Sequence, residues 1–313
     1  MILILAPESD LHARRVAQEI ALLGQIARFL DWRRAGRGLC ASMCFDSAGL
    51  GRWVRASADV PELDLGEVRA VWNRRPGFPA ISEEVLNDEH RQFALHEWQN
   101  LADGMIQSLT PGARVVSPSC AEHAATKPVQ LAAAQRGGLR VPHTLITSDP
   151  GKAAEFIERH AGRVVHKAMT GPRNLFLETR LWQESDHSAL RQLPLAPTIF
   201  QELIEGPKDI RVTVVGDTVY AAAIDSSRSR AGLDSRLDMD VPVEPFELPD
   251  RAITLLLALM RDLGLLFATV DLKMTADGEL YFLELNPQGQ FLYVEILTGQ
   301  PIAAALARLL ATA

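Results

Sequence analysis

Apolar residues in the first third of the chain form short runs, separated by stretches with helical periodicity. The run at residues 1–6 predicts a buried strand, and the helix after it has Asp10 and Gly24 at its N-cap and C-cap positions. A second strand is predicted at residues 68–76, and a long helix begins at Ser82 and continues to about Leu109. Strands that alternate with helices indicate an α/β fold, so residues 1–117 are predicted to form an N-terminal α/β domain.

The rest of the chain predicts two further lobes. A helix from Ser119 to Gly138 is interrupted at Lys127-Pro128, and a strand, a capped helix and another strand follow it. This pattern predicts a small central α+β lobe over residues 118–198. Residues 199–313 contain several apolar strands and an amphipathic helix at 249–264, which predict an antiparallel sheet with helices on one side. Ligands favour clefts between such lobes.

The clearest hairpin signal is Asp277-Gly278, which lies between two alternating runs. If these two residues form the turn, Asp271 lies opposite Glu284, and Asn286 lies on the same face. The opposite face is then predicted to be a core face, made of Val270, Leu272, Met274, Tyr281, Leu283 and Leu285. Like charges directly across a strand pair are destabilising, so a positive group is expected between the two carboxylates.

Asp271, Glu284 and Asn286 together offer hard oxygen ligands. Such a set suits a magnesium ion that also binds substrate phosphates, and zinc is disfavoured because no histidine or cysteine joins it. The alternative is a solvent-facing hairpin, in which Lys273 on the same face neutralises Asp271.

Composition limits the classes of function. The chain has 313 residues, 47% of them hydrophobic and 23% charged, as in ordinary globular proteins. Its net charge of −7 gives no general attraction to nucleic acid or to anionic membranes. The apolar runs are shorter than a membrane span, and residues 1–9 have no basic region of a signal peptide. Three cysteines, Cys40, Cys44 and Cys120, fit the reducing cytoplasm.

Candidate phosphate ligands come from outside the usual glycine-rich motifs, since the sequence contains neither a P-loop nor a complete GxGxxG. Lys167 lies in an otherwise apolar strand, where a lysine is costly unless it meets an anion. Lys127 lies on a separate element of the same lobe. The backbone of residues 202–204 is predicted to pair with an adenine edge, and Asp209 with ribose hydroxyls. The nucleotide contacts are therefore predicted to be Lys127, Lys167, Gln201, Glu202, Leu203, Ile204 and Asp209.

Arginines supply the candidate catalytic charges. Arg211 follows this segment on the next strand, where its fork suits phosphoryl oxygens. Arg228, Arg230 and Arg236 lie in one long polar loop and are candidates for stabilising transition-state charge. Taken as isolated signals, residues 202–204, Asp209 and Arg211 are explained equally well by surface salt bridges.

The order Lys127, Lys167, "QELI", "KDIRV", D-x-K and "FLELNP" resembles the ATP-grasp ligases over nearly the whole chain. "VWNRRP", "IDS", "LDSR" and "YFLELNPQGQFLYVEILTGQPIAAAL" are more narrowly similar to the ATP-grasp ligases that mature microviridin-type peptides, the graspetides. Three positions depart from that pattern. Ser227 replaces a glutamine, Ser235 a tryptophan and Asn73 a tyrosine, which leaves the subfamily and the acceptor open.

The resemblance implies an ATP-grasp fold and the formation of lactones or lactams between side chains of a ribosomal precursor peptide with leader and core. It implies ATP and Mg²⁺ as cofactors, with the metal on Asp271, Glu284 and Asn286. Arg211 and Arg236 would steady an acyl phosphate, and Arg228 completes the predicted catalytic set. One alternative is a ligase that adds free amino acids to a peptide or protein. Another is a non-catalytic nucleotide-binding module that senses a peptide. A homodimer is an open alternative for its assembly.

Overall fold

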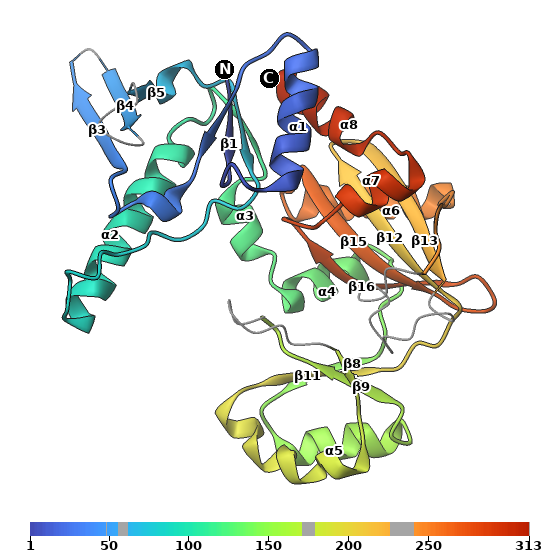
Figure 1. Ribbon diagram of the computed structural model, residues 1–313. Coiled ribbons are helices and arrows are strands. Elements are labelled where there is room, and N and C mark those ends of the chain that lie inside the picture. Colours follow the sequence, from blue (N-terminus) through green and yellow to red (C-terminus); the bar gives the residue numbers. More distant parts are fainter. Residues whose placement is uncertain (48, 56–61, 171–178, 226–240, 313) are drawn as a thin grey trace.

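The computed structural model describes residues 1–47, 49–55, 62–170, 179–225 and 241–312. Four sheets are present in this part of the chain. Figure 1 shows the N-terminal and C-terminal parts packed together, with the central lobe below them and both termini at the top. The mixture of parallel and antiparallel sheets with helices confirms the predicted combination of α/β and α+β structure.

The N-terminal sheet is parallel, with strand order β2-β1-β6-β7. Its strands are β1 (Ile2–Leu5), β2 (Ala27–Leu30), β6 (Ala70–Asn73) and β7 (Arg114–Val116). Helix α1 (Leu11–Leu22) begins where the side chain of Asp10 accepts a hydrogen bond from the amide of Ala13, as predicted. Gly24 follows the helix with φ of 71°, which favours glycine.

Two features of this region differ from the prediction. Helix α2 (Asp88–Gln107) begins six residues after Ser82, because Asn87 caps it by accepting from the amide of His90. A small antiparallel sheet of β3 (Cys40–Asp46), β4 (Gly49–Arg55) and β5 (Leu63–Asp64) was not predicted. Its first strand is largely exposed and therefore has no clear apolar alternation. Short 3₁₀ helices lie at Trp32–Arg34 and Leu65–Glu67.

The central lobe contains an antiparallel sheet of order β10-β9-β11-β8, with helix α5 on one side (Figure 1). The predicted break at residue 127 separates helix α3 (Ser119–Ala124) from helix α4 (Lys127–Arg136), and α4 packs against the C-terminal sheet. The remaining elements are β8 (Thr144–Thr147), α5 (Pro150–Arg159), β9 (Val164–Lys167), β10 (Arg180–Leu181), a 3₁₀ helix (Glu184–Leu195) and β11 (Thr198–Glu202).

The C-terminal sheet is antiparallel, with order β14-β13-β12-β15-β16. Its strands are β12 (Lys208–Val215), β13 (Thr218–Asp225), β14 (Val243–Pro245), β15 (Phe267–Met274) and β16 (Leu280–Asn286). Helices α6 (Asp250–Asp262), α7 (Leu292–Thr298) and α8 (Ile302–Ala311) follow in the same region.

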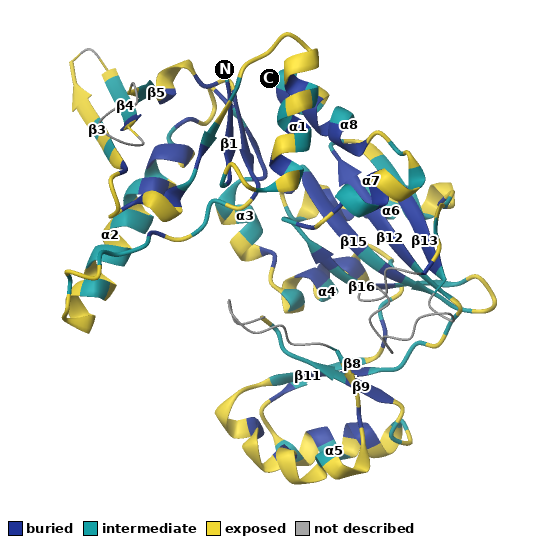
Figure 2. Ribbon diagram, in the orientation of Figure 1, coloured by how far each residue is buried: buried dark blue, intermediate teal, exposed yellow. Residues whose placement is uncertain are grey.

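Helices cover both faces of this sheet, so the prediction of helices on one side was wrong. One face packs with α4 and α6 around residues such as Val212 and Leu256. The other face packs against α8, and α8 in turn packs against α1, so that Phe267 and Leu306 share a core with Ile4. This shared core explains why the sheet strands are deeply buried (Figure 2) and ties the two ends of the chain together.

The β15–β16 hairpin contains a turn longer than predicted. The amide of Thr275 donates to the carbonyl of Glu279, so residues on both sides of Asp277-Gly278 belong to the turn. Met274 therefore pairs with Leu280, and a β-bulge between Leu272 and Asp271 restores the predicted Asp271–Glu284 pair. The core residues of β16 are consequently Phe282 and Leu285 rather than Tyr281 and Leu283.

Candidate active site

Three charged residues form a row across neighbouring strands of the C-terminal sheet. Arg211 on β12 pairs in register with Asp271 on β15, and Asp271 pairs with Glu284 on β16. Asn286, two residues beyond Glu284, pairs with Thr269 of β15. The sheet thus brings together one predicted phosphoryl ligand and all three predicted metal ligands.

The two carboxylates are neutralised by two different cations. Arg211 Nη1 lies 2.5 Å from Asp271 Oδ1, and Lys127 Nζ lies 3.2 Å from Glu284 Oε2. The structure therefore supplies the expected positive charge as one cation for each carboxylate, and not as a single group between the two. Lys273, the neutralising group in the alternative interpretation, forms an ion pair with Asp209 at 2.8 Å. The predicted ribose ligand Asp209 therefore already has a cation partner.

The donor atoms fit a magnesium ion that shares its coordination with phosphates. Asn286 Nδ2 donates to Glu284 Oε1 at 3.1 Å, so the amide and the carboxylate are adjacent. Exchange of the amide oxygen and nitrogen would present three oxygen donors, which magnesium prefers. Within the described residues, no group of three or more His, Cys, Asp or Glu side chains could hold a metal ion. Two carboxylates and an amide form an incomplete cage, which suits a metal that is also bound by phosphate oxygens.

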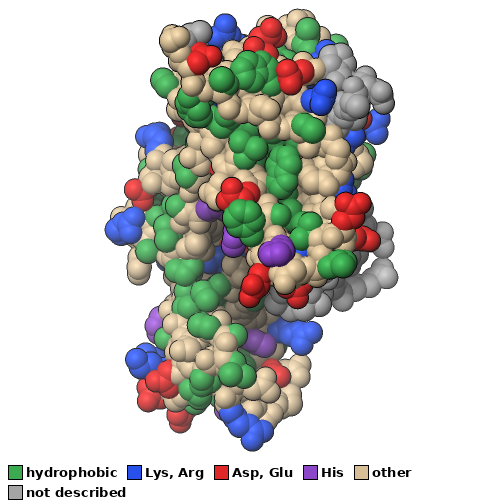
Figure 3. Space-filling model, turned by 90° about the vertical axis from the view of Figure 1, so that its left-hand side faces the viewer, with side chains coloured by type: hydrophobic (Ala, Val, Ile, Leu, Met, Phe, Trp, Pro, Cys, Tyr) green, Lys and Arg blue, Asp and Glu red, His purple; other side chains and the backbone are tan. Residues whose placement is uncertain are grey.

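Helix α4 delivers Lys127 to this row. Lys127 is the first residue of the helix, and buried Gln130, one turn later, fixes the helix against β16. The Gln130 side chain accepts from the amide of Leu285 at 2.9 Å and donates to its carbonyl at 2.8 Å. Lys127 Nζ also donates to the carbonyl of Ala168, directly after β9, and thereby joins helix α4 to the sheet of the central lobe. Figure 3 shows a recess between that lobe, at the bottom, and the body above it.

The predicted nucleotide residues of the central lobe form their own small network. Lys167 Nζ donates to Gln201 Oε1 at 3.2 Å, and Gln201 Nε2 donates to Thr144 Oγ1 at 2.9 Å. The sheet also places Lys167 beside Ile199, one strand away from Thr144. Lys167 and Gln201 are therefore in contact, and Gln201 is buried within the sheet.

Backbone bonds limit which groups of residues 202–204 remain for an adenine edge. The amide of Glu202 donates to the carbonyl of His143, and the amide of Leu203 donates to that of Arg163. The Glu202 carboxylate accepts from the amide of His143 at 2.8 Å. Over the described ranges of the chain, the amide of Ile204 has no hydrogen-bond partner. It is the amide best placed to serve a ligand.

The structure does not test the remaining predicted arginines. Arg228, Arg230 and Arg236 fall in residues 226–240, outside the described part of the chain. The last described residue before them is Asp225, the end of β13.

Sequence reasoning missed a buried ionic group beside the metal ligands. Arg74 is fully buried, and its Nη1 donates to the carbonyls of Gln288 and Gly289 at 2.6 and 3.1 Å. Burial lowers the pKa of Arg74 to about 10. Burial likewise raises the pKa of Glu122 to about 8, and Glu122 Oε2 accepts from Gln288 Nε2 at 2.8 Å. The sequence signals for Arg74 are its position directly after an apolar strand and its place in the segment "VWNRRP" that carries the family resemblance.

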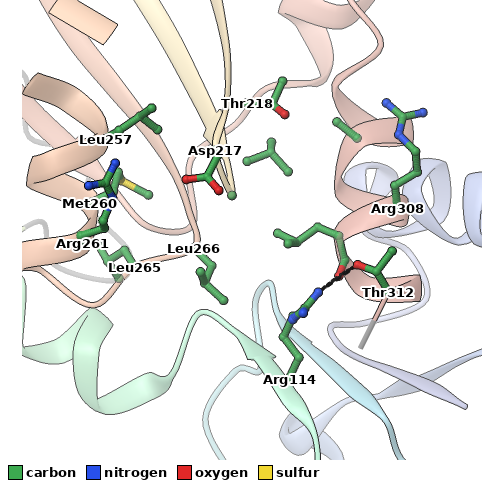
Figure 4. A pocket seen from close by; sticks show the side chains of 14 residues that line it. Arg114, Asp217, Thr218, Leu257, Met260, Arg261, Leu265, Leu266, Arg308 and Thr312 are labelled. Atoms are coloured by element: carbon green, nitrogen blue, oxygen red, sulfur yellow. Dashed lines mark hydrogen bonds between the residues drawn. The ribbon is translucent and has the colours of Figure 1, made fainter. Parts of the chain in front are cut away.

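A cavity lies at the opposite end of the C-terminal sheet (Figure 4). Arg114, Asp217, Leu257, Leu266 and Arg308 are among its lining residues. Val215, which lines the cavity at the end of β12, lies about 13 Å from Arg211 at the usual rise of a strand. None of the predicted site residues within the described ranges lines this cavity.

Comparisons with known proteins agree with the geometry of the site. Residues 124–310 match the RimK-like ATP-grasp domain family. Among solved structures, the macrocyclase MdnC of Microcystis aeruginosa MRC, bound with precursor peptide MdnA, is 26% identical, with a TM-score of 0.88 over 100% of this chain and 99% of that chain. A search of curated protein sequences gives no significant match.

Two further structures hold ligands. A RiPP-associated ATP-grasp ligase of Chryseobacterium gregarium, in complex with ADP and a leader and core peptide, is 26% identical, with a TM-score of 0.87 over 99% of this chain and 96% of that chain. The ATP-grasp ligase PsnB, complexed with minimal precursor, Mg and ADP, is 26% identical, with a TM-score of 0.82 over 99% of this chain and 96% of that chain.

These relatives favour the peptide-cross-linking interpretation over its alternatives. The family match covers more than half of the chain and includes Lys127, Lys167, Arg211 and every predicted metal ligand. The resemblance inferred from the sequence is confirmed: this chain is a member of the RimK-like ATP-grasp family.

Proposed function

We propose that this chain is an ATP-dependent ligase that closes side-chain lactones or lactams in a ribosomal precursor peptide. The observation that carries the proposal is the row Arg211–Asp271–Glu284, in which Glu284 forms an ion pair with Lys127. This row offers oxygen ligands for a metal and two cations for phosphates on one surface. It occurs in a chain that aligns along its full length with ligases bound to precursor peptides.

The reaction overcomes the poor electrophilicity of a carboxylate. An oxygen of an Asp or Glu side chain of the peptide attacks the γ-phosphorus of ATP, and the bond to the β-γ bridging oxygen breaks to release ADP. A hydroxyl or amine of the same peptide then attacks the acyl carbon of the acyl phosphate. Phosphate leaves and the nucleophile loses a proton. Each closed ring therefore removes the elements of one water from the peptide.

The residues divide into two groups by charge. Asp271, Glu284 and Asn286 would hold Mg²⁺, which when bound offsets phosphate charge. Lys127, Lys167 and Gln201 bind the nucleotide together with the segment 202–204. Arg211 lies in the same row and steadies phosphoryl oxygens through its fork. Arg228 and Arg236, which lie outside the described residues, are assigned to the charge of the acyl phosphate. ATP and Mg²⁺ are the cofactors.

The partner is a precursor peptide with a leader and a core, and the N-terminal, central and C-terminal lobes act together on it. Remote contacts with the leader hold a flexible core near the acyl phosphate, where effective concentration is high. Nucleic acid has no part in the proposal. In the described residues, no helix is long and apolar enough to cross a lipid bilayer. The free cysteines and the use of ATP support a cytoplasmic site of action.

The test is mass spectrometry of a candidate precursor, encoded beside the gene and rich in Thr, Ser, Lys, Asp and Glu near its end. After co-expression the peptide is expected to lose one water per ring and to contain protease-resistant cross-links between acidic and hydroxyl or amine side chains. A gain in mass by whole amino acids would support the amino-acid-adding ligase instead. An unchanged peptide, with ATP turnover indifferent to it, would support a sensor.

A further inference from the structure

The segment that follows the predicted metal ligand Asn286 is fixed by side chains from four separate elements. Residues 287–291 receive two hydrogen bonds from Arg74 at the end of β6 and one from Arg211 of β12, which donates to the carbonyl of Gln290 at 3.0 Å. Glu122 of α3 accepts from Gln288, and His12 Nε2 of α1 accepts from the amide of Phe291 at 3.3 Å.

Close packing adds to this restraint. The amide of Gly289 donates to the carbonyl of Asn286 at 3.1 Å, which closes a turn directly after the ligand. A Cβ atom on Gly289 would lie 1.7 Å from Thr269 Oγ1, far inside van der Waals contact. Thr269 is the register partner of Asn286 on β15. The segment is therefore pressed against the strand beside the ligand, and any displacement of it is transmitted to Asn286.

Arg74 is the largest contributor to this arrangement and comes from the N-terminal sheet. Its side chain has no exposed surface and lies 3.4 Å from Asp10 Oδ1. A buried guanidinium is costly unless its N–H groups are satisfied. The two carbonyls of residues 288 and 289 supply much of that satisfaction, so the position of the segment and the position of Arg74 depend on each other.

We propose that Arg74 is a positioning residue for the magnesium-binding end of β16. By holding the carbonyls of Gln288 and Gly289, it fixes Asn286 on one side. The same segment carries the carbonyl of Gln290, which accepts from Arg211. Because Arg211 Nη1 donates to Asp271, Arg74 also helps to fix the other side of the metal site. The N-terminal domain thereby sets the geometry of a metal site to which it contributes no ligand. This inference rests on the proposed function of Asp271, Glu284 and Asn286.

The shape of the guanidinium distinguishes positioning from simple charge. A lysine at position 74 keeps the positive charge beside Asp10, but its single ammonium lacks the planar fork of arginine. A purely structural role that requires only a buried cation is therefore satisfied by lysine. A positioning role that requires the fork is not satisfied by lysine.

The experiment compares Arg74→Lys and Arg74→Met with Arg69→Met as the matched control. Arg69 immediately precedes the same strand at its other end and is exposed. Manganese is titrated into each protein in the presence of ADP, and free Mn²⁺ is measured by electron paramagnetic resonance. We expect the Mn²⁺ dissociation constant of Arg74→Lys to rise by about 10- to 100-fold, the usual effect of losing an outer-sphere support. ADP binding without metal is expected to stay unchanged, as is Mn²⁺ binding in Arg69→Met.

Several results would overturn the inference. Wild-type Mn²⁺ affinity in Arg74→Lys would do so, because the fork would then be dispensable. Loss of cooperative unfolding in Arg74→Lys would also do so, because it would assign the residue to the stability of the fold. If Arg74→Met alone fails to fold, Arg74→Lys decides the matter. Failure of the unmodified protein to bind Mn²⁺ with ADP would contradict the proposed function itself, which separates the two failures.

Discussion

Lys127 Nζ and Glu284 Oε2 lie 3.2 Å apart, although the two residues belong to a helix and a strand separated by more than 150 positions in the chain. The pair joins a predicted phosphate ligand to a predicted metal ligand. A metal ion that binds Glu284 will compete with Lys127 for the carboxylate and free the ammonium for a phosphate. The two binding events are therefore expected to support each other.

Replacement of Glu284 by glutamine should separate metal binding from stability. Glutamine removes one charge but keeps an oxygen for Lys127. Because the ion pair is partly exposed, the free energy of unfolding of the metal-free protein should change by less than about 1 kcal/mol. Mn²⁺ binding in the presence of ADP should be lost. Urea unfolding and Mn²⁺ titration check both statements, with Glu279→Gln, an exposed partner of Arg140 in the same hairpin, as control. Retained Mn²⁺ affinity would show that the metal binds elsewhere.

Replacement of Lys127 by methionine should weaken nucleotide binding. The variant loses a charge-assisted hydrogen bond to phosphate, an interaction worth roughly 1.5–3 kcal/mol, so the dissociation constant for ATP should rise by about tenfold or more. Arg136→Met on the same helix α4 is the control, because that arginine is exposed and pairs with Asp262. Calorimetric titration with ATP gives the measurement. Equal affinities of the two variants would remove Lys127 from the site.

Replacement of Gln130 by leucine should destabilise the protein. The side chain satisfies both backbone groups of Leu285, and leucine leaves this buried N–H and C=O unpaired, at a cost of about 1–3 kcal/mol each. The free energy of unfolding in urea should fall by about 2–4 kcal/mol, a sum that allows for partial relaxation. Gln135→Leu, an exposed position of the same helix, should have little effect. A stability loss no larger than in that control would contradict the assignment.

Glu122 predicts an unusual dependence of stability on pH. Its pKa is raised by burial to about 8 from a model-peptide value of 4.5, so between these values the native state holds a proton that the unfolded state has released. The contribution of this group to stability is therefore present at pH 4.5 and decreases as the pH rises toward 8. Glu122→Gln keeps an oxygen for Gln288 and cannot ionise.

The comparison of these two proteins isolates the carboxyl group. Urea unfolding should show similar stability at pH 5 and a more stable Glu122→Gln variant at pH 8. The His12 imidazole, whose pKa burial lowers to about 4, titrates in both proteins and cancels in the difference. A difference between the two proteins that does not change with pH would place the titration elsewhere.

The sequence predicted the chemistry of the C-terminal hairpin better than its geometry. The pairing of Asp271 with Glu284 was right because a longer turn shifted the register by one residue and a bulge shifted it back. Neither feature has a local signal strong enough to predict. The same shift moved Phe282 into the core in place of Leu283. Like-charge repulsion, in contrast, correctly required cations, because that rule depends on charge alone.

Long-range burial limited the rest of the prediction. Arg74 and Glu122 look like ordinary surface residues in sequence, and only the packing of α1, α3 and β6 against the 287–291 segment buries them. The β3–β4–β5 sheet escaped detection because β3 is largely exposed and its sequence shows no clear apolar alternation. The start of helix α2 was predicted at Ser82, whereas the helix begins at Asp88. Ser82 and Asn87 are both acceptable caps, and the choice between them depends on tertiary structure.

The side chain of Gln130 has a consequence for how a peptide reaches this protein. Strand β16 is the last strand of its sheet, and the free edge of such a strand ordinarily invites an extended chain to add to it. Here Gln130 occupies both backbone groups of Leu285, and the carbonyl of Arg140 takes the amide of Phe282. An extended substrate cannot form a sixth strand at that edge. A bound peptide is therefore expected to contact the molecule elsewhere than along this edge of β16.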